Sequence, residues 1–126
     1  MARVVVVEDE EIVRKVLHSL LGSAGHEVTR FNDGAAFIES ADLDSADLII
    51  TDLAMPTPGE EVIKSVRERG LSIPIIVLTG ILDNRAMDNL MEIGADRVIE
   101  KPIRAATLIS MVELLVSAPE REEADR

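Results

Sequence analysis

The chain has 126 residues, with 24 acidic against 13 basic side chains, no cysteine and only two aromatic residues, both phenylalanine. This length is typical of one domain, and the net charge of −11 argues against direct binding to nucleic-acid phosphates. The lack of cysteine excludes disulfides and thiol chemistry, and no apolar run approaches the ~20 residues of a membrane span, so we expect a soluble cytoplasmic domain with no membrane contact.

Apolar runs and helical stripes alternate from the start of the chain. Residues 4–7 are four consecutive valines and predict a strand buried on both faces. An amphipathic helix that ends near Gly22 is predicted next, with six apolar side chains turned inward: Ile12, Val13, Val16, Leu17, Leu20 and Leu21. Residues 27–31 alternate polar and apolar types, as an edge strand does, and a turn at 32–34 precedes a short helix over 35–41.

The second half of the chain repeats this alternation. In chain order it predicts a strand at 47–51, a proline-containing loop at 55–59, a helix at 60–69, a strand at 74–79, a helix at 83–93 with Asp83 as its N-cap, a strand at 97–100 and a helix at 104–116. The two histidines, His18 and His26, are expected on the surface, because histidine is seldom fully buried.

Five strands and five helices in strict alternation predict parallel βαβ units with right-handed crossovers. We therefore expect an α/β fold: a flavodoxin-like three-layer sandwich around a five-stranded parallel sheet in the order 2-1-3-4-5. The domain should cover residues 1–116. Residues 117–126 contain Pro119 and no large apolar side chain, and are expected to form an acidic, disordered tail.

Chemistry in such a sheet is expected where the strands end, at their carboxyl edge. The predicted strands end in Glu8–Asp9, Asp52, Thr79 and Lys101, and lysine occurs at only three positions in the chain. Carboxylates that converge in one crevice repel each other unless a hard cation such as Mg²⁺ joins them. With an ammonium and a hydroxyl close by, Asp52 is the best candidate for a nucleophile that takes up a phosphoryl group.

These motifs resemble those of the response-regulator receiver domain, the phosphoacceptor of two-component signalling. The resemblance covers residues 3–116 and rests on Val4–Glu10, Ile50–Pro56, Pro74–Gly80 and the stretch from Gly94 to Pro102. It implies that the protein is not a conventional enzyme but a single-domain regulator that takes a phosphoryl group from a histidine kinase or a histidine phosphotransfer protein. Its attachment and removal would be catalysed by the domain itself.

The resemblance also implies a role for each site residue. Mg²⁺, for which Mn²⁺ can substitute, would be held by Glu8, Asp9, Asp52 and the backbone carbonyl of Ala54. The remaining assignments are Asp52 as phosphoacceptor, Thr79 as switch hydroxyl, Lys101 as the phosphoryl-binding cation, the amides of Ala54 and Gly80 as phosphoryl donors, and Pro102 as the site of a cis peptide bond.

Several residues depart from the family pattern. Val98 stands where a switch aromatic is usual, so output should depend on backbone shifts or on the packing of smaller side chains. Glu60 replaces a common glycine after Asp52, and Ile103 replaces a common phenylalanine. Ala54 and Ile81 occupy positions that tune dephosphorylation in this family. Both are apolar, so we expect water access rather than an assisting side chain to set the lifetime of the phosphoryl group.

The sequence leaves several functions to be compared. A stand-alone receiver would signal through phosphorylation-dependent binding of a downstream protein, at the surface of residues 83–93, 97–100 and 104–116, and could form a weak dimer. The chain could instead be a receiver fragment of a longer regulator or hybrid kinase. A Mg²⁺-dependent phosphohydrolase is a more remote option, since such enzymes typically carry a second aspartate at the position of Ala54. A nucleotide- or flavin-binding module on the same fold is a further option, but the chain lacks the glycine-rich phosphate-binding motif that such a module needs.

Overall fold

The computed structural model describes residues 2–117, which form five strands and five helices in strict alternation. Their bounds are β1 (Arg3–Val7), α1 (Glu11–Ser23), β2 (Glu27–Phe31), α2 (Gly34–Ser40), β3 (Leu48–Asp52), α3 (Gly59–Glu68), β4 (Ile75–Thr79), α4 (Asn84–Ile93), β5 (Arg97–Glu100) and α5 (Ala105–Ser117). The predicted tail covers residues 117–126, and residues 118–126 lie outside the described part of the chain.

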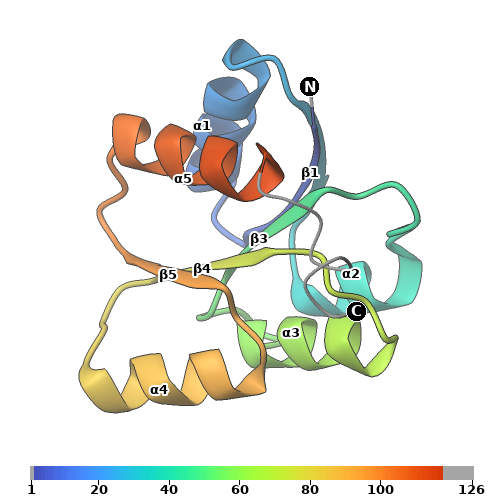
Figure 1. The fold of residues 1–126 in the computed structure, drawn as a ribbon, viewed down its shortest axis with the longest axis vertical. Helices are drawn as coiled ribbons and strands as arrows, with labels where there is room; N and C mark the ends of the chain where they lie inside the picture. Colours follow the sequence, from blue (N-terminus) through green and yellow to red (C-terminus); the bar gives the residue numbers. More distant parts are fainter. Residues whose placement is uncertain (1, 118–126) are drawn as a thin grey trace.

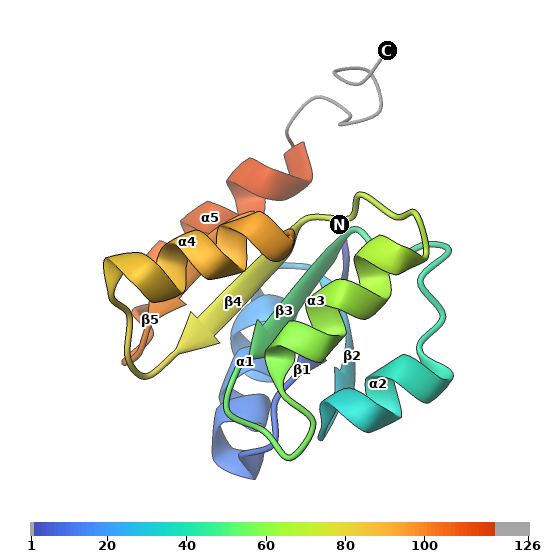
Figure 2. The same cartoon turned by 90° about the horizontal axis from the view of Figure 1, so that it is seen from below.

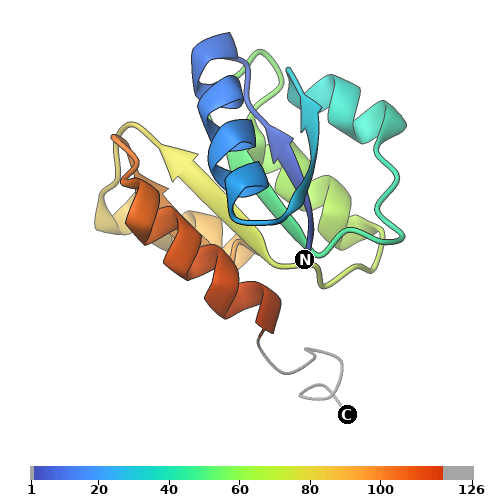
Figure 3. The same ribbon diagram turned by 90° about the horizontal axis from the view of Figure 1, so that it is seen from above.

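The sheet has the predicted architecture. All neighbouring strands are parallel, and their order is β2-β1-β3-β4-β5. Helices α1 and α5 cover one face of the sheet, while α2, α3 and α4 cover the other (Figure 1). The views from below and from above show these two helical layers in turn (Figures 2 and 3). The flavodoxin-like three-layer sandwich is thus confirmed.

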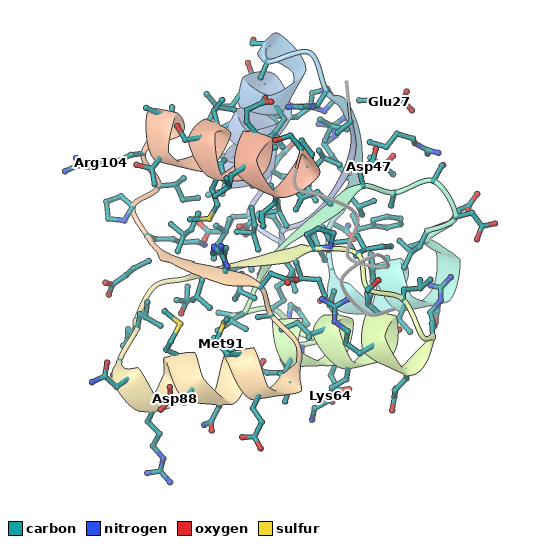
Figure 4. All side chains as sticks on the ribbon, in the orientation of Figure 1. Glu27, Asp47, Lys64, Asp88, Met91 and Arg104 are labelled. Atoms are coloured by element: carbon teal, nitrogen blue, oxygen red, sulfur yellow. The ribbon has the colours of Figure 1, made fainter. Side chains whose placement is uncertain are left out.

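Two apolar cores, one on each face, hold the layers together. Successive side chains of β1 alternate between them: Val5 and Val7 pack with α2, α3 and α4, and Val4 and Val6 pack with α1 and α5. The central strands β3 and β4 are buried along their whole length, as expected for a parallel sheet covered on both faces. Charged side chains such as Lys64 lie on the outer side of their helices (Figure 4).

Local signals set several of the helix ends. The Asp83 carboxylate accepts a hydrogen bond from the Ala86 amide at 2.8 Å and caps α4, as predicted. Gly70, just past the end of α3, and Gly94, at the end of α4, have φ of 76° and 121°, in the region that favours glycine. The bounds of the elements differ from prediction by about one residue, and one such difference matters: Asp52 is the last residue of β3 rather than the first residue beyond it.

The inward stripe predicted for α1 is too broad. Ile12 and Val16 are 78% and 52% exposed, whereas Leu17 and Leu21 are fully buried. A helix turns about 100° per residue, so Val16 lies about 100° around the axis from Leu17 and outside the face that meets the sheet. The two exposed side chains therefore contribute to the surface of α1 rather than to the core.

The surface position predicted for His26 is also wrong. His26 is 8% exposed: its Nδ1 accepts a hydrogen bond from the Ala2 amide at 3.1 Å, and its Nε2 lies 3.0 Å from the Glu113 carboxylate. His18 is partly buried, and its Nδ1 is buried without a hydrogen-bond partner among the described residues. The loop after α1 closes over the start of β1, which is why a loop histidine is buried here.

Candidate functional site

The sheet register brings the ends of the central strands to one edge. Val7 pairs with Thr51, Asp52 with Leu78, and Thr79 with Glu100. The residues that follow or end these strands are therefore neighbours in space, as the order of the strands predicts. Asp52 is only 3% exposed, and its Oδ1 accepts a hydrogen bond from the Leu53 amide at 2.8 Å.

Three carboxylates converge at this edge. Glu8, Glu10 and Asp52 each offer an oxygen, and these oxygens lie within 4.8 Å of one another. Glu8 is fully buried and its Oε2 accepts a hydrogen bond from the Glu10 amide at 3.1 Å, whereas the Asp9 side chain is exposed and lies outside the group. Analysis of the sequence missed Glu10. The chain bends at Asp9 just after β1 and brings Glu10 beside Glu8, which a run of adjacent acids does not reveal.

Lys101 supplies the positive charge of the site. Its Nζ lies 3.3 Å from Asp52 Oδ2, 3.5 Å from Glu8 Oε1 and 3.9 Å from Glu10 Oε1. Although partial burial opposes a charged ammonium, the neighbouring carboxylates of Glu8 and Asp52 hold the pKa of Lys101 above its ordinary value. The lysine therefore stays protonated and neutralises part of the acidic group.

Burial of Glu8 has the largest effect on its ionisation. Desolvation raises the pKa of Glu8 from 4.5 to about 7; the charge of Asp52 adds to this rise, while the Glu10 amide and Lys101 oppose it. The site thus carries more negative charge than one lysine compensates. Such a carboxylate is stabilised in its charged form by any further cation that reaches it.

The hydroxyl of Thr79 is turned toward its own loop. It donates to the Ile81 carbonyl at 3.0 Å and accepts from the Ile81 amide at 3.3 Å. The amides of Ala54 and Gly80, in the loops that follow β3 and β4, have no hydrogen-bond partner among the described residues. Two backbone amides on these loops and the hydroxyl at the end of β4 thus lie around Asp52, and the two amides are available to an incoming anion.

The remaining predicted residues lie around this centre. The Lys101–Pro102 peptide bond is cis, the conformation that the resemblance implies. Val98 is partly buried and packs against the core shared with α2, α3 and α4, so no aromatic ring lies beside Thr79 on β5. Ile81 is 81% exposed and Ile103 is partly buried against the opposite core.

The donor set fits a hard divalent cation. Carboxylate and carbonyl oxygens are the ligands that Mg²⁺ prefers, and one or two protein carboxylates with additional waters are usual. The grouped oxygens of Glu8, Glu10 and Asp52, together with the shifted pKa of the buried Glu8, are properties of a site that gains from a bound cation. The chain has no cysteine, so no thiolate is available as a softer ligand.

The family model of the response regulator receiver domain matches residues 4–113. Among curated proteins, the transcriptional regulatory protein DltR of Streptococcus agalactiae is 35% identical over 113 residues, which cover 89% of this chain and 50% of that protein. The chain spans about half the length of the curated relatives it matches.

Solved structures give the same result. The Vibrio cholerae chemotaxis protein CheY4 is 30% identical with a TM-score of 0.85, over 91% of this chain and 98% of that one. The receiver domain of the Pseudomonas aeruginosa sensor histidine kinase PA1611 is 27% identical with a TM-score of 0.82, over 93% and 98%, and was solved with a magnesium ion in its active site cleft. Within residues 2–117, no helix has the length and hydrophobicity needed to cross a membrane.

Proposed function

Because the chain belongs to the response regulator receiver domain family, whose members are the phosphoacceptors of two-component signalling, we propose that Asp52 accepts a phosphoryl group from a histidine kinase or a histidine phosphotransfer protein. The observation that carries this proposal is the position of Asp52. It is a nearly buried carboxylate at the end of a central strand, 3.3 Å from the Lys101 ammonium and beside loops with unpaired amides.

The chemistry is a transfer between two nucleophiles. An oxygen of Asp52 attacks phosphorus, a P–O bond forms, and the P–N bond to the donor imidazole breaks with its electron pair left on nitrogen. Lys101 and the amides of Ala54 and Gly80 stabilise the charge on the phosphoryl oxygens. Dephosphorylation ends the signal: water attacks the same phosphorus, the P–O bond to Asp52 breaks, and inorganic phosphate and the free carboxylate are formed. The domain thereby limits the lifetime of its own signal.

A magnesium ion supplies the positive charge that the transferring phosphoryl group needs. Glu8, Asp9, Asp52 and the Ala54 carbonyl would hold it, and Mn²⁺ can replace it. Asp9 directly follows Glu8, and its side chain has no hydrogen bond among the described residues, so it is free to rotate toward an ion. The magnesium ion in the related PA1611 receiver domain supports this assignment.

Phosphorylation would act as a switch through Thr79. A phosphoryl group adds about −1.5 to −2 of charge at neutral pH and strong acceptor oxygens, which compete with the Ile81 carbonyl for the hydroxyl proton. When the hydroxyl turns inward, its bonds to Ile81 break and the β4–α4 loop is free to shift. Val98 leaves no ring to follow this motion, so the loop backbone itself carries the change.

The surface of α4, β5 and α5 is our candidate for the downstream partner, and also for a weak dimer. A groove on this surface is lined by Arg97 on β5 and by Met111 and Leu114 on α5, and Leu114 is 60% exposed. The apolar side chains of Met111 and Leu114 beside the Arg97 cation offer a mixed apolar and charged contact to a protein partner.

Two alternatives are tested by the same measurements. A receiver fragment of a longer regulator or hybrid kinase would have the same chemistry. This alternative is supported by the curated relatives, which are about twice as long as the segment that this chain matches. A phosphohydrolase would turn over phosphate esters, which we do not expect because Ala54 offers no acid.

The test is incubation with acetyl phosphate: we expect stoichiometric, Mg²⁺-dependent phosphorylation that a chelator abolishes, and multiple turnover of an ester would support the hydrolase instead.

A further inference from the structure

The turn before α2 contacts the loop that follows Asp52. The Asp33 Oδ1 accepts a hydrogen bond from the amide of Thr57 at 2.9 Å, although 24 residues separate the two in sequence. Beside this bond the two backbones touch: a Cβ added to Gly34 would lie 2.7 Å from the Thr57 carbonyl oxygen. Two independent contacts therefore join the β2–α2 turn to the middle of the β3–α3 loop.

Capping of α2 accounts for only one of the two Asp33 oxygens. Oδ2 accepts from the Ala35 amide at 3.2 Å, in the usual N-cap geometry, and leaves Oδ1 for Thr57. Although slight burial opposes ionisation, the hydrogen bonds from the Thr57 and Ala35 amides hold the pKa of Asp33 below its ordinary value. The carboxylate is thus charged and occupied on both oxygens at neutral pH.

Apart from Met55, which is buried in the core, the loop is held by few contacts, and few of these are hydrogen bonds to other segments. Pro56 and Pro58 have no amide hydrogen, and the amides of Met55 and Gly59 both return to the Leu53 carbonyl within the loop. Among the described residues, Thr57 is the residue between Ala54 and Gly59 whose amide bonds a side chain from another segment. Within the described part of the chain, the Asp33 carboxylate is therefore the side chain that anchors the middle of this loop by a hydrogen bond from outside it.

We propose that Asp33 is a positioning residue for the phosphoacceptor site: by holding Thr57, it fixes the β3–α3 loop and with it the Ala54 carbonyl and amide. This inference rests on the proposed function, in which these two Ala54 groups contact the metal ion and the phosphoryl group. Asp33 touches neither reactant. It acts through the loop, in the way that outer partners of metal ligands commonly set affinity.

Two substitutions separate anchoring from capping. Serine is a good N-cap, so Asp33→Ser keeps the bond to α2, but its single short hydroxyl cannot also reach Thr57. Asp33→Ala loses both bonds. If Asp33 positions the loop, both variants should lose Mg²⁺ affinity to the same degree, about tenfold, while only Asp33→Ala should also lower the melting temperature markedly. Asn32→Ala, at a neighbouring exposed residue with no hydrogen bond among the described residues, is the control and should bind Mg²⁺ as the parent does.

The readout is two-dimensional amide NMR with Mg²⁺ alone as the titrant, because the chain lacks the tryptophan and tyrosine needed for a fluorescence titration. In the parent protein we expect slow hydrogen exchange at the Thr57 amide, and fast exchange in both Asp33 variants. Mg²⁺ affinity of Asp33→Ser within twofold of the parent, with Thr57 exchange accelerated, would overturn the inference.

A second variant tests the same contact from its other side. Gly34→Ala leaves Asp33 in place but forces Thr57 away, so it should weaken Mg²⁺ binding in the same way, and unchanged binding in this variant would contradict the inference even if Asp33→Ser fails to fold. Failure of the proposed function is distinct: the parent protein itself would then bind no Mg²⁺ and take no phosphoryl group, with the Thr57 amide still protected.

Discussion

The Lys101 ammonium lies 3.3 Å from the Asp52 carboxylate, so the residue that follows β5 places a positive charge beside the side chain that ends β3. The same ammonium lies 3.5 Å from Glu8, which is fully buried. One lysine is therefore the ion-pair partner of two acids that are almost inaccessible to water. Its removal should be felt both in the stability of the domain and in its chemistry.

Lys101→Ala should lower the free energy of unfolding of the metal-free protein by about 1–3 kcal/mol at pH 8, because it leaves buried carboxylates without a partner. It should also slow phosphorylation, since the cation that meets the phosphoryl oxygens is lost. Urea unfolding followed by circular dichroism measures the first effect. Lys64→Ala, at an exposed lysine of α3, should change stability by less than about 0.5 kcal/mol, and an equal effect of both substitutions would contradict the account.

The ionisation of Glu8 predicts how stability depends on pH. Its pKa is about 7 in the folded chain, against 4.5 ordinarily, so the folded state binds the proton more tightly. The resulting stabilisation is complete below the unfolded pKa and is lost as pH rises through about 7. The metal-free domain should accordingly melt at a lower temperature at pH 8 than at pH 5.5. Glu8→Gln should reduce this difference in melting temperature, because glutamine does not titrate.

Mg²⁺ should reverse this loss. A cation that binds the ionised carboxylates stabilises the folded state by mass action, and protons compete with it at low pH. At 10 to 100 times the Kd measured at pH 8, Mg²⁺ should add on the order of 1–3 kcal/mol to the free energy of unfolding at that pH. The same Mg²⁺ concentration should raise the melting temperature less at pH 5.5. Equal rises at the two pH values in the parent protein would show that Glu8 is not part of the metal site.

The fold could be predicted almost completely from the sequence, because it depends on patterns that many residues share. The valine run of β1 and the alternation of apolar runs with helical stripes specify the parallel sheet and its order. Side-chain direction is a weaker signal. Ile12 and Val16 lie at helical spacing from buried leucines, yet only the packing of α1 against the sheet decides that they remain exposed.

The site was predicted at the level of strand ends but not of individual rotamers. The register explains why Glu8, Asp52, Thr79 and Lys101 meet at one edge. Glu10, and not Asp9, lies in the carboxylate group because of the way the β1–α1 turn is folded, and a run of adjacent acids cannot reveal that fold. The anchor on Asp33 joins segments 24 residues apart and has no signal in a single sequence.

Thr79 separates phosphorylation from its consequence. Thr79→Ala removes the hydroxyl that bonds the Ile81 backbone but leaves Asp52 and the carboxylates intact. We expect phosphorylation by acetyl phosphate to persist within about tenfold of the parent rate, while the amide shifts of the β4–α4 loop on phosphorylation are largely lost. Thr79→Ser keeps the hydroxyl and should retain these shifts. Full loop shifts in the alanine variant would exclude Thr79 as the switch.

Gly59 tests how tightly the phosphoacceptor loop is packed. A Cβ at this position would lie 2.2 Å from the Asp52 carbonyl oxygen, so Gly59→Ala must displace the backbone at the site. We expect a loss of about 2–4 kcal/mol in unfolding free energy together with weaker Mg²⁺ binding. Gly22 lies in α1 with no atom within 4 Å of an added Cβ, and Gly22→Ala should instead be neutral or stabilising by up to about 1 kcal/mol. Similar effects of the two substitutions would show that the loop tolerates the displacement.

The identity of the phosphoacceptor is tested most directly by intact-mass spectrometry of the parent protein and Asp52→Asn after incubation with acetyl phosphate and Mg²⁺. Asparagine keeps the size of the side chain but lacks the nucleophilic carboxylate. We predict that the parent gains the mass of one phosphoryl group and that Asp52→Asn gains none. A phosphoryl group on Asp52→Asn, or an unmodified parent protein under conditions in which it binds Mg²⁺, would contradict the assignment of Asp52.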